Sequence, residues 1–330
     1  MHDKIRWGIL GCGRIARKFA TDLKLVDDAI LVAAGARSIE SANAFARDFP
    51  VAYTHGSYEE LVQNENVDVI YIATPHSEHY KNTMLCLEHG KAVLCEKAFA
   101  VNHQQAKAMI EKARNKKVFL MEALWTKFLP IFQVVQSLLK EKKIGQIKSV
   151  LINFGFAPQA PAPARLYDPS LAGGTMLDIG IYNVFMAMSV LGKPASVKAF
   201  MTPVNTGVDE QCAVTMQYED GAIAQLFSTF ASNLATEADI CGTNGRIRLT
   251  HRFYSPDAVI EYYSGTPDTK EVIPVERGDG HGYQYEAQHV CECIQKGLTE
   301  SPVMTHQDTL DLIEVLDEIR RQAGIVYPED

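Results

Sequence analysis

The sequence lacks the features that mark a membrane, secreted or nucleic-acid-binding protein. It has no block rich in lysine or arginine, and its formal net charge is −8 at pH 7, which disfavours nucleic acid and anionic membranes as partners. No apolar run approaches the roughly 20 residues that span a bilayer, and the N-terminus, Met-His-Asp-Lys, has no apolar signal segment. The sequence therefore predicts a cytoplasmic protein that binds neither membrane nor nucleic acid.

Cysteines are few and widely spaced. The seven cysteines are an odd number, which argues against a complete disulfide framework, so we expect reduced thiols. His76 and His79 have a spacing that places two ligands on one helix face, but no third acid or thiol is placed to join them. We therefore predict no metal site. The two histidines either lie near a bound ligand or simply begin a helix.

Length and composition predict a soluble globular chain of about two domains. Of the 330 residues, 47% are apolar and 22% are charged, which is ordinary for such proteins. Strand and helix patterns alternate up to residue 121, and from about residue 125 the chain is richer in strands, with hairpin signals at 220–221 and 244–245. We predict a doubly wound parallel Rossmann sheet in residues 1–123. In residues 124–330 we predict an α+β domain with a large, mostly antiparallel, open-faced sheet.

A glycine-rich turn follows the first apolar strand, residues 5–10. In its G-x-G-x-x-A spacing, Gly11 permits a tight turn, Gly13 lets the backbone approach a pyrophosphate, and Ala16 lets the next helix lie close to the sheet. The amides at the start of that helix then face the phosphates. An ordinary strand-to-helix turn can have the same spacing, so the surrounding sequence has to decide between that turn and a dinucleotide-binding one. The candidate cofactor-binding residues of the turn are Gly11, Cys12, Gly13, Arg14 and Ile15.

Arg37 and Ser38 follow the second predicted strand, residues 30–36. A site that prefers NAD commonly has an acidic residue here, which binds the ribose 2′-hydroxyl. A guanidinium can instead form a fork onto a 2′-phosphate, with the Ser38 hydroxyl beside it. We therefore predict NADP(H) as the preferred cofactor, with NAD(H) as the alternative. Arg37 as a solvated residue at a strand end is the competing interpretation, and Ser38 also has the position of a helix N-cap.

Polar residues follow two more buried strands of the first half. After the strand at 67–73 come Thr74, Pro75, His76 and His79, and after the strand at 91–95 come Glu96 and Lys97. Doubly wound sheets bind ligands outside the carboxyl ends of their strands. These residues therefore belong with the glycine turn and Arg37 on one rim, where we expect them to contact the cofactor.

Lys97 is the strongest candidate for catalysis. On this rim it can reach the nicotinamide end of a dinucleotide, and the positive charge of an oxidised nicotinamide favours loss of the ammonium proton. Lys97 can then orient a substrate hydroxyl and help to remove its proton while hydride leaves the carbon. The alternative is a solvated lysine at the end of a strand.

A second group of candidates lies in residues 174–182. Once this segment is helical, Asp178 and Tyr182 are four residues apart and share a face. The carboxylate can accept hydrogen bonds from substrate hydroxyls, and the phenol can donate to or accept from the reacting oxygen. We expect Lys97 and Tyr182 to meet at one carbon–oxygen bond. A buried structural carboxylate and a core aromatic residue are the alternatives on spacing alone.

Four segments carry a resemblance to the Gfo/Idh/MocA oxidoreductase family. They are residues 8–16, 73–76, 96–97 and 173–180. Within that family, residues 56–61, 84–97 and 119–123 are similar to the branch of dihydrodiol dehydrogenases and NADP-dependent D-xylose 1-dehydrogenases. The resemblance covers most of the chain and is strongest in its first half.

The resemblance implies roles for single residues. Lys97 takes the position of the family's catalytic lysine and Asp178 that of its substrate-contacting acid, while Tyr182 stands where many relatives have histidine and this branch has tyrosine. Arg37 and Ser38 match the NADP-selecting pair. The family usually has Glu-Lys-Pro, whereas Ala98 follows Lys97 here. Because that proline is associated with a cis bond, we expect a looser or trans bond at Ala98.

Further residues are candidates for contact with the substrate. Glu122 and Trp125, with Lys127, begin the crossover between the predicted domains, where they either line the substrate cleft or pack. Arg165 and Tyr167 lie in a loop rich in proline and alanine, which is either a lid over the substrate or a mobile surface loop.

Together these observations predict an NADP-preferring dehydrogenase or reductase. Hydride would pass between nicotinamide and a secondary alcohol of a sugar or cyclic polyol. The alternative is a catalytically silent NAD(P)-sensing regulator or scaffold of the same fold, against which the complete set of Lys97, Asp178 and Tyr182 argues. The strand-rich second half and the resemblance also lead us to expect a homodimer through the flat face of the second sheet.

Overall fold

The computed structural model describes residues 4–159, 161–265 and 269–330. The chain folds into two compact units, described here one after the other. The first comprises the chain up to Phe128 together with Gly278–Leu310, and the second comprises Leu129–Arg277 together with Asp311–Asp330. The segment Gly278–Leu310 thus packs with the first unit, although the predicted boundary places it in the second domain. Its grouping depends on tertiary contacts that no local pattern reveals.

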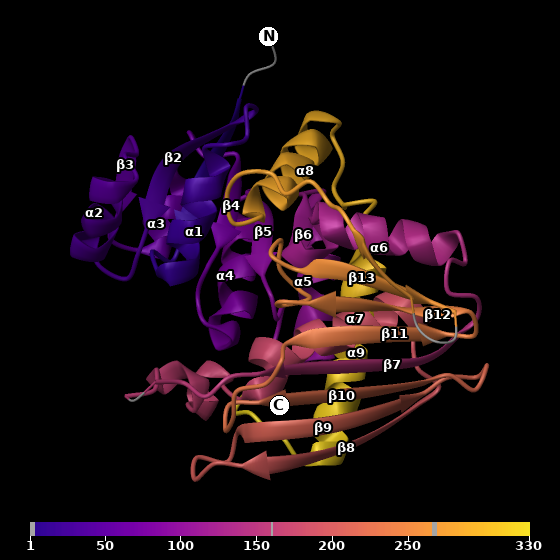
Figure 1. Ribbon diagram of the computed structural model, residues 1–330. Helices are drawn as coiled ribbons and strands as arrows, with labels where there is room; N and C mark the ends of the chain where they lie inside the picture. The colour runs from indigo at the N-terminus through magenta and orange to yellow at the C-terminus, as the bar shows by residue number, and fades with distance from the viewer. Residues whose placement is uncertain (1–3, 160, 266–268) are drawn as a thin grey trace. The chain divides into compact units, whose positions relative to one another are not determined.

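The first unit is built on a parallel six-stranded sheet with the order β3-β2-β1-β4-β5-β6 (Figure 1). Its strands are β1 (Ile5–Leu10), β2 (Ala29–Gly35), β3 (Tyr53–His55), β4 (Val69–Ile72), β5 (Ala92–Glu96) and β6 (Leu120–Ala123). The chain winds outward from β1 to β3 and then returns past β1 to β4, which is the reversal of a doubly wound Rossmann sheet. The predicted sheet is confirmed, with the short edge strand β3 as an addition.

Helices connect these strands. They are α1 (Arg14–Leu23), α2 (Ile39–Asp48), α3 (Tyr58–Gln63), α4 (His76–Glu88) and α5 (His103–Lys116), followed by a 3₁₀ turn (Trp125–Phe128). The helix α8 (Tyr283–Gln295) comes from the distant segment and packs against α1. At the N-caps of α2, α3 and α5, a side-chain oxygen accepts a hydrogen bond from a backbone amide of the helix. The capping residues are Ser38, Ser57 and Asn102. Such local signals are the reason that the sequence predicts the starts of these helices.

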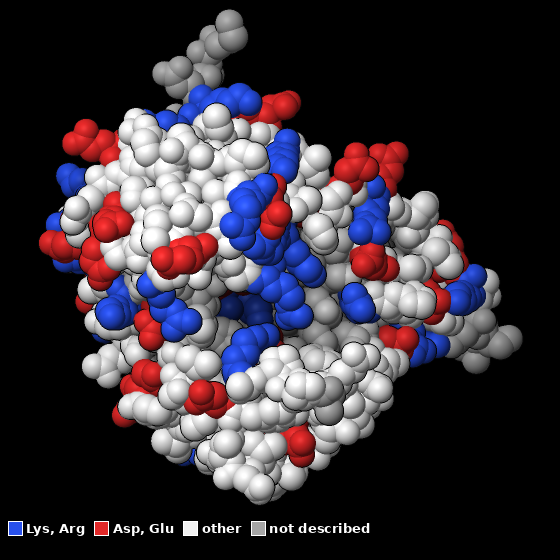
Figure 2. All heavy atoms as spheres, turned by 90° about the vertical axis from the view of Figure 1, so that its left-hand side faces the viewer, with Lys and Arg blue, Asp and Glu red and all other residues white. Residues whose placement is uncertain are grey.

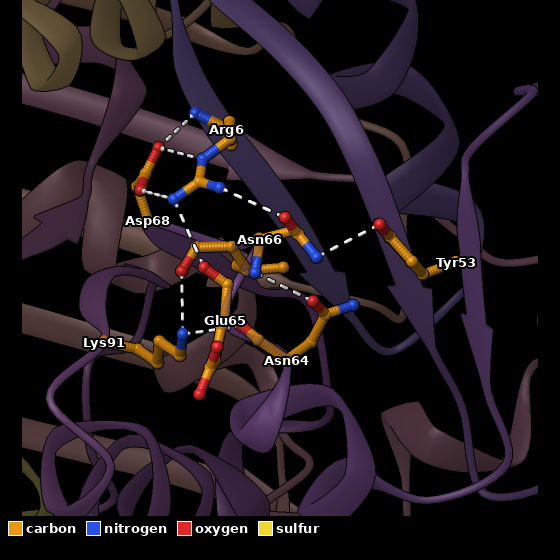
Figure 3. A network of polar contacts seen from close by, with 8 residues as sticks. Arg6, Tyr53, Asn64, Glu65, Asn66, Asp68 and Lys91 are labelled. Carbon is orange, nitrogen blue, oxygen red and sulfur yellow. Dashed lines mark hydrogen bonds and ion pairs between the residues drawn. The ribbon is translucent and has the colours of Figure 1, made fainter.

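A polar network joins the loops at the amino-terminal ends of these strands (Figure 3). Asp68 accepts hydrogen bonds from Arg6 at its backbone amide (2.8 Å), Nε (3.0 Å) and Nη2 (2.6 Å). Lys91 donates to the carbonyl oxygens of Asn64 (2.7 Å) and Val67 (2.8 Å). The network ties β1 to the chain before β4 and β5 without using the carboxyl ends of the strands, where the candidate ligand-binding residues lie.

The second unit is built on an eight-stranded sheet with the order β14-β13-β12-β11-β7-β10-β9-β8. Its strands are β7 (Ile147–Gly155), β8 (Ser196–Pro203), β9 (Asp209–Gln217), β10 (Ile223–Thr229), β11 (Glu237–Gly242), β12 (Gly245–Thr250), β13 (Val259–Ser264) and β14 (Thr269–Ile273). Of the pairs formed by these strands, β7 with β10 is parallel and the others are antiparallel. Both predicted hairpins, β9–β10 and β11–β12, are present, and the mostly antiparallel sheet is confirmed.

Helices cover one face of this sheet. The helices are α6 (Pro130–Lys140), α7 (Ile181–Leu191) and α9 (His306–Ala323), and a π-turn (Met176–Gly180) leads directly into α7. In Figure 1, α7 lies behind the sheet, where it contacts β7 and β10. Burial alternates along β8 and β9, so the opposite face is open to solvent, as an antiparallel sheet allows.

One helical stretch corrects the sequence analysis. Pro169–Leu191 is long and apolar enough to cross a membrane by length and composition, whereas we expected no apolar run of that kind. In the structure, 72% of its most apolar window is buried, and Val184, Met186 and Ala187 of α7 belong to the core of the second unit. Such burial is typical of a core helix in a soluble protein.

Candidate active site

The glycine-rich turn lies between β1 and α1, as the sequence predicts. Gly11 has a φ of +95°, and a Cβ on it would lie 3.0 Å from Cγ2 of Thr74, so the position requires glycine. Gly13 is the N-cap of α1, and a Cβ there would meet no atom within 4 Å. Arg14 and Ile15 form the first turn, which has no acidic residue, and no described side chain caps its amides. These amides and the open space at Gly13 suit an anionic ligand.

Arg37 and Cys12 both influence the pKa of Tyr58, which lies at the start of α3. Burial raises the pKa of the Tyr58 phenol, the exposed Arg37 guanidinium opposes that rise, and Cys12 adds to it. The Cys12 thiol donates to a backbone carbonyl oxygen of β2 at 3.6 Å, and burial raises its pKa to about 11. The turn therefore contains an unreactive thiol, that of Cys12, and the Tyr58 phenol senses both this thiol and the Arg37 cation. The phenol of Tyr58 is an addition to the residues that the sequence analysis selected.

Basic side chains gather on the face of the molecule shown in Figure 2. This view turns the side of α2 and β3 toward the reader, and Lys and Arg form a band there while Asp and Glu are scattered around it. The band contrasts with the net charge of −8. A local excess of positive charge attracts anionic ligands such as dinucleotide phosphates.

The rim segment after β4 is largely buried. His79 is fully buried, with Nδ1 2.7 Å from the carbonyl oxygen of Ala98 and Nε2 2.9 Å from that of Thr74. Burial lowers the pKa of His79 to about 4, although the two carbonyl oxygens favour the protonated ring. The ring centroids of His76 and His79 lie 5.8 Å apart, in an edge-to-face arrangement. His79 thus lies between the two rim segments, and its neutral ring donates a hydrogen bond to only one of the two carbonyl oxygens.

Lys97 follows β5 on the same rim. Its backbone amide donates to Oε2 of Glu96 at 3.2 Å, and the Tyr71 hydroxyl of β4 donates to Oε1 of the same carboxyl. Burial raises the pKa of Glu96 to about 7, even though Tyr71 and Lys97 both favour its ionised form. The bond between Lys97 and Ala98 is cis, which corrects our expectation of a looser or trans bond.

Glu122 and Trp125 are both buried in the first unit. Glu122 is 1% exposed, and its oxygens accept hydrogen bonds from the Phe99 amide (3.3 Å) and the Thr309 hydroxyl (3.0 Å). Burial raises the pKa of Glu122 to about 7. The Trp125 ring stacks on that of Tyr283 at 4.6 Å. This is the packing that the sequence left open as an alternative, and the predicted contact of these residues with substrate stays a prediction.

In the second unit, Asp178 and Tyr182 lie in the π-turn and at the start of α7. The Asp178 carboxylate faces the Arg165 guanidinium, with Nη1 3.1 Å from Oδ1 and Nη2 3.5 Å from Oδ2. The Tyr182 ring lies 4.7 Å from that of Tyr254, which also stacks on Phe154 at 4.6 Å. Burial raises the pKa of Tyr254, and the charge of Asp178 adds to that rise. An acid, a cation and two phenols thus form one polar and aromatic group.

The turn before Asp178 is built by two glycines and a buried acid. Gly174 has a φ of +103°, and a Cβ on it would lie 2.1 Å from Oδ1 of Asp209. A Cβ on Gly173 would lie 2.7 Å from a carbonyl oxygen of the preceding loop. Oδ2 of Asp209 accepts hydrogen bonds from the Thr175 hydroxyl (2.6 Å) and the Met176 amide (2.7 Å). The Gly-Gly-Thr sequence therefore has a packing reason, which is to seat the π-turn on Asp209.

Tyr71, Tyr254 and Asp209 are not among the residues that the sequence predicts for the site. Tyr71 lies in the apolar, fully buried strand β4, and a buried phenol needs a hydrogen-bond partner, which is a signal that could have found it. Tyr254 and Asp209 carry no local motif, because only the pairing of distant strands brings them to Tyr182 and Thr175.

Seven cysteines and many possible metal ligands lie among the described residues. The seven cysteines are free thiols. Among the described residues, no group of three or more His, Cys, Asp or Glu side chains could hold a metal ion.

Comparisons with known sequences extend over most of the chain. Residues 5–124 match the family model described as "Oxidoreductase family, NAD-binding Rossmann fold", and residues 132–248 match the Gfo/Idh/MocA C-terminal domain. The trans-1,2-dihydrobenzene-1,2-diol dehydrogenase of Xenopus laevis is 39% identical over 98% of this chain and 99% of its own. The enzyme of that name from Sus scrofa is 36% identical, with 99% of each chain covered.

Solved structures share the fold. An aldose-aldose oxidoreductase from Caulobacter crescentus, complexed with glycerol, superposes with a TM-score of 0.88 at 23% identity, covering 97% of this chain and 98% of its own. A 3-ketoreductase from Actinomadura kijaniata, in complex with NADP and TDP-benzene, gives 0.87 at 24% identity over the same shares. With two family models matched in order and relatives similar over nearly the full length, this chain belongs to the Gfo/Idh/MocA family of oxidoreductases.

Proposed function

We propose that this protein is an NADP-preferring dehydrogenase or reductase that acts on a CH–OH group of a sugar or a cyclic diol. One observation carries the proposal. The glycine turn, Arg37 and Lys97 follow β1, β2 and β5, so they stand at the carboxyl ends of strands in one parallel sheet. That edge is where doubly wound sheets bind dinucleotides.

The residues of this edge fit a phosphorylated dinucleotide. The amides of α1 and the open space at Gly13 would hold the pyrophosphate, and Arg37 with Ser38 would hold the 2′-phosphate. Ser38 caps α2 through its hydroxyl oxygen and donates its proton to Oγ of Ser41 at 3.2 Å, a donation that would turn to the phosphate when the cofactor binds. Thr74, Pro75, His76, His79, Glu96 and Lys97 form the part of the rim that we assign to the ribose and nicotinamide. When bound, the nicotinamide ring supplies the hydride donor or acceptor.

The residues of the second unit suit a hydroxylated ring. Asp178 would accept a hydrogen bond from one hydroxyl, and Arg165, which forms an ion pair with it, would hold a second oxygen. Tyr182 is our candidate in this unit for exchanging the proton of the reacting oxygen, as Lys97 is in the first unit. The aromatic rings of Tyr182, Tyr254 and Phe154, of which the last two stack and the first is tilted against them, would give the substrate ring an apolar contact. Relatives named for a cyclic diol and a fold relative named for aldoses support this substrate class.

A substrate screen tests the proposal. Purified protein is incubated with a panel of aldoses and cyclic diols and with either NADP or NAD, and the absorbance of reduced nicotinamide is followed. We expect turnover with NADP on at least one member of the panel and slower turnover with NAD. Tight NADP binding without turnover on any member would instead favour the catalytically silent regulator.

We further propose that the protein is cytoplasmic and forms a homodimer through the open face of its second sheet. The exposed side chains of Leu151, Phe200 and Ile223 on that sheet support the dimer.

A further inference from the structure

The segment that follows α9 folds back onto the second unit. Arg320, near the end of α9, is 4% exposed, and its guanidinium donates two hydrogen bonds to the Asp330 carboxylate, from Nη2 to Oδ1 at 2.7 Å and from Nη1 to Oδ2 at 3.3 Å. The same carboxylate accepts a hydrogen bond from the backbone amide of Tyr327 at 2.9 Å. The Ile325 amide donates to the Arg320 carbonyl oxygen at 2.9 Å. These contacts close the segment into a loop that is bound to α9.

Tyr327 connects this loop to Gly173, in the turn before Asp178. The Tyr327 side chain is buried, and the guanidinium carbon of Arg320 lies 4.9 Å from the centroid of its ring, within cation–π distance. The Tyr327 hydroxyl donates a hydrogen bond to the carbonyl oxygen of Gly173 at 2.6 Å. Both partners are buried, and a buried carbonyl oxygen that loses its donor is left with an uncompensated desolvation penalty. The hydroxyl therefore holds this carbonyl group in place.

Gly173 lies where the loop of Arg165 meets the turn that leads to Asp178. A Cβ on Gly173 would lie 2.7 Å from the carbonyl oxygen of Arg165, so the two stretches of backbone are in close contact. The next amide, that of Gly174, donates to the carbonyl oxygen of Leu166 at 2.8 Å. The loop and the turn thus meet at Gly173, while their side chains form the ion pair between Arg165 and Asp178. A displacement of Gly173 would change the geometry of that ion pair.

We propose that Tyr327 is a positioning residue for substrate binding: its hydroxyl holds the carbonyl oxygen of Gly173 and thereby sets Asp178 against Arg165. The proposal rests on the proposed function, in which this ion pair binds two oxygens of the substrate. Asp209 holds the same turn from β9, so side chains from two segments distant in sequence fix it. Tyr327 acts on the substrate only through the turn.

Steady-state kinetics of Tyr327→Phe tests the role in binding. The substitution removes the hydroxyl and keeps the ring beside Arg320. With a substrate from the panel, we expect KM to rise by about 3- to 10-fold, as for the loss of one hydrogen bond, and kcat and the Kd for NADP to stay close to those of the wild type. An unchanged KM, or a loss confined to kcat, would overturn the proposal.

Tyr218→Phe is the matched control for these measurements. Tyr218 is a second buried tyrosine of this unit, and its hydroxyl lies 3.6 Å from the sulfur of Met216 and not on the turn. Its removal therefore deletes a buried hydroxyl without touching Gly173, and we expect the wild-type KM. A rise in KM as large as that in Tyr327→Phe would mean that any buried hydroxyl of the unit has this effect, which would overturn the proposal.

Limited proteolysis with trypsin tests the contact without any turnover. Arg165 is the only lysine or arginine between Lys148 and Lys193, so cleavage after it reports on this loop. We expect cleavage after Arg165 to be about 3- to 10-fold faster in Tyr327→Phe than in the wild type. Cleavage at the exposed Lys142, in the turn after α6, should keep its rate. Equal acceleration at both sites, or none at Arg165, would overturn the proposal.

The two measurements separate this proposal from the proposed function. A wild type that turns over no member of the panel would refute the proposed function, and the role in substrate binding with it, whatever the cleavage shows. Turnover by the wild type, faster cleavage after Arg165 and an unchanged KM in Tyr327→Phe would overturn this proposal alone, because the hydroxyl would then stabilise the turn without affecting substrate binding.

Discussion

Lys97 is the residue whose removal tests the chemistry most directly. Lys97→Met keeps the length of the side chain and removes its ammonium. We expect turnover to fall by about 10²–10⁴-fold, as for loss of a general acid–base group. NADP binding should persist, because α1 and Arg37 would hold the phosphates. Steady-state assays and fluorescence titration with NADP measure the two effects. Lys107→Met, on the exposed side of α5, is the matched control, and turnover by Lys97→Met at the control's rate would rule out the proposed role.

Arg37 tests the cofactor preference. Arg37→Ala removes the guanidinium that would pair with a 2′-phosphate, a charge-assisted contact that NAD does not offer. We expect the Kd for NADP to rise by about 10-fold or more and the Kd for NAD to change little. Arg47→Ala, at the exposed end of α2, controls for a general loss of positive charge. Equal losses for both cofactors in Arg37→Ala would refute recognition of the 2′-phosphate.

At the scale of elements, Asp209 connects β9 to the π-turn that carries Asp178. Burial raises the pKa of Asp209 to about 6, above its value of about 3.9 in an unfolded chain. The native state therefore binds more protons between these values, and the contribution of Asp209 to the free energy of unfolding falls as pH rises through this window. An asparagine side chain at position 209 does not titrate, so it makes no such pH-dependent contribution to the free energy of unfolding.

Asp209→Asn should therefore destabilise the protein in a pH-dependent way. We expect a loss of about 1–3 kcal/mol at acidic pH, shrinking as pH rises through about 6. Urea unfolding at a series of pH values measures it, with Glu219→Gln in the exposed turn after β9 as the control. A loss that is the same at every pH would contradict the assignment of this titration to Asp209. A raised KM for substrate in the variant would in addition connect the turn to Asp178.

The elements that the sequence predicts are those with local causes. Capping hydroxyls at Ser38 and Ser57 begin helices where expected, and the turn residues of the two hairpins fix β9–β10 and β11–β12. The strand β3 has three residues, too few for a periodic pattern. The π-turn depends on Asp209, which is distant in sequence. For the same reason the sequence does not reveal Tyr254, which reaches Tyr182 only through tertiary packing.

At the scale of the molecule, the open face of the second sheet has two parts. Apolar side chains stand on β7, β10 and β8, where Leu151, Ile223 and Phe200 are 42%, 43% and 77% exposed. Strand pairing places them on one face, because Leu151 lies opposite Gln225 and Phe200 opposite Ala213, which in turn pairs with Phe227. On β11 and β12 the same face carries ion pairs of Arg246 and Arg248 with Asp239. An apolar part, which runs from β7 to the edge strand β8, thus lies beside a charged part on β11 and β12, and protein interfaces combine an apolar area with polar surroundings.

Phe200→Glu tests whether this face joins two copies of the chain. A carboxylate placed in the apolar part would be desolvated on association, so we expect the dimer Kd to rise by about 100-fold or more. Light scattering at micromolar concentration should then give a dimer mass for the wild type and a monomer mass for the variant. Val326→Glu introduces the same charge at a valine that is 69% exposed outside the sheet, and it should remain dimeric. A monomeric wild type would end the dimer proposal, and a dimeric Phe200→Glu would assign the contact to another surface. Turnover per chain in the monomeric variant would further show whether the reaction needs the partner subunit.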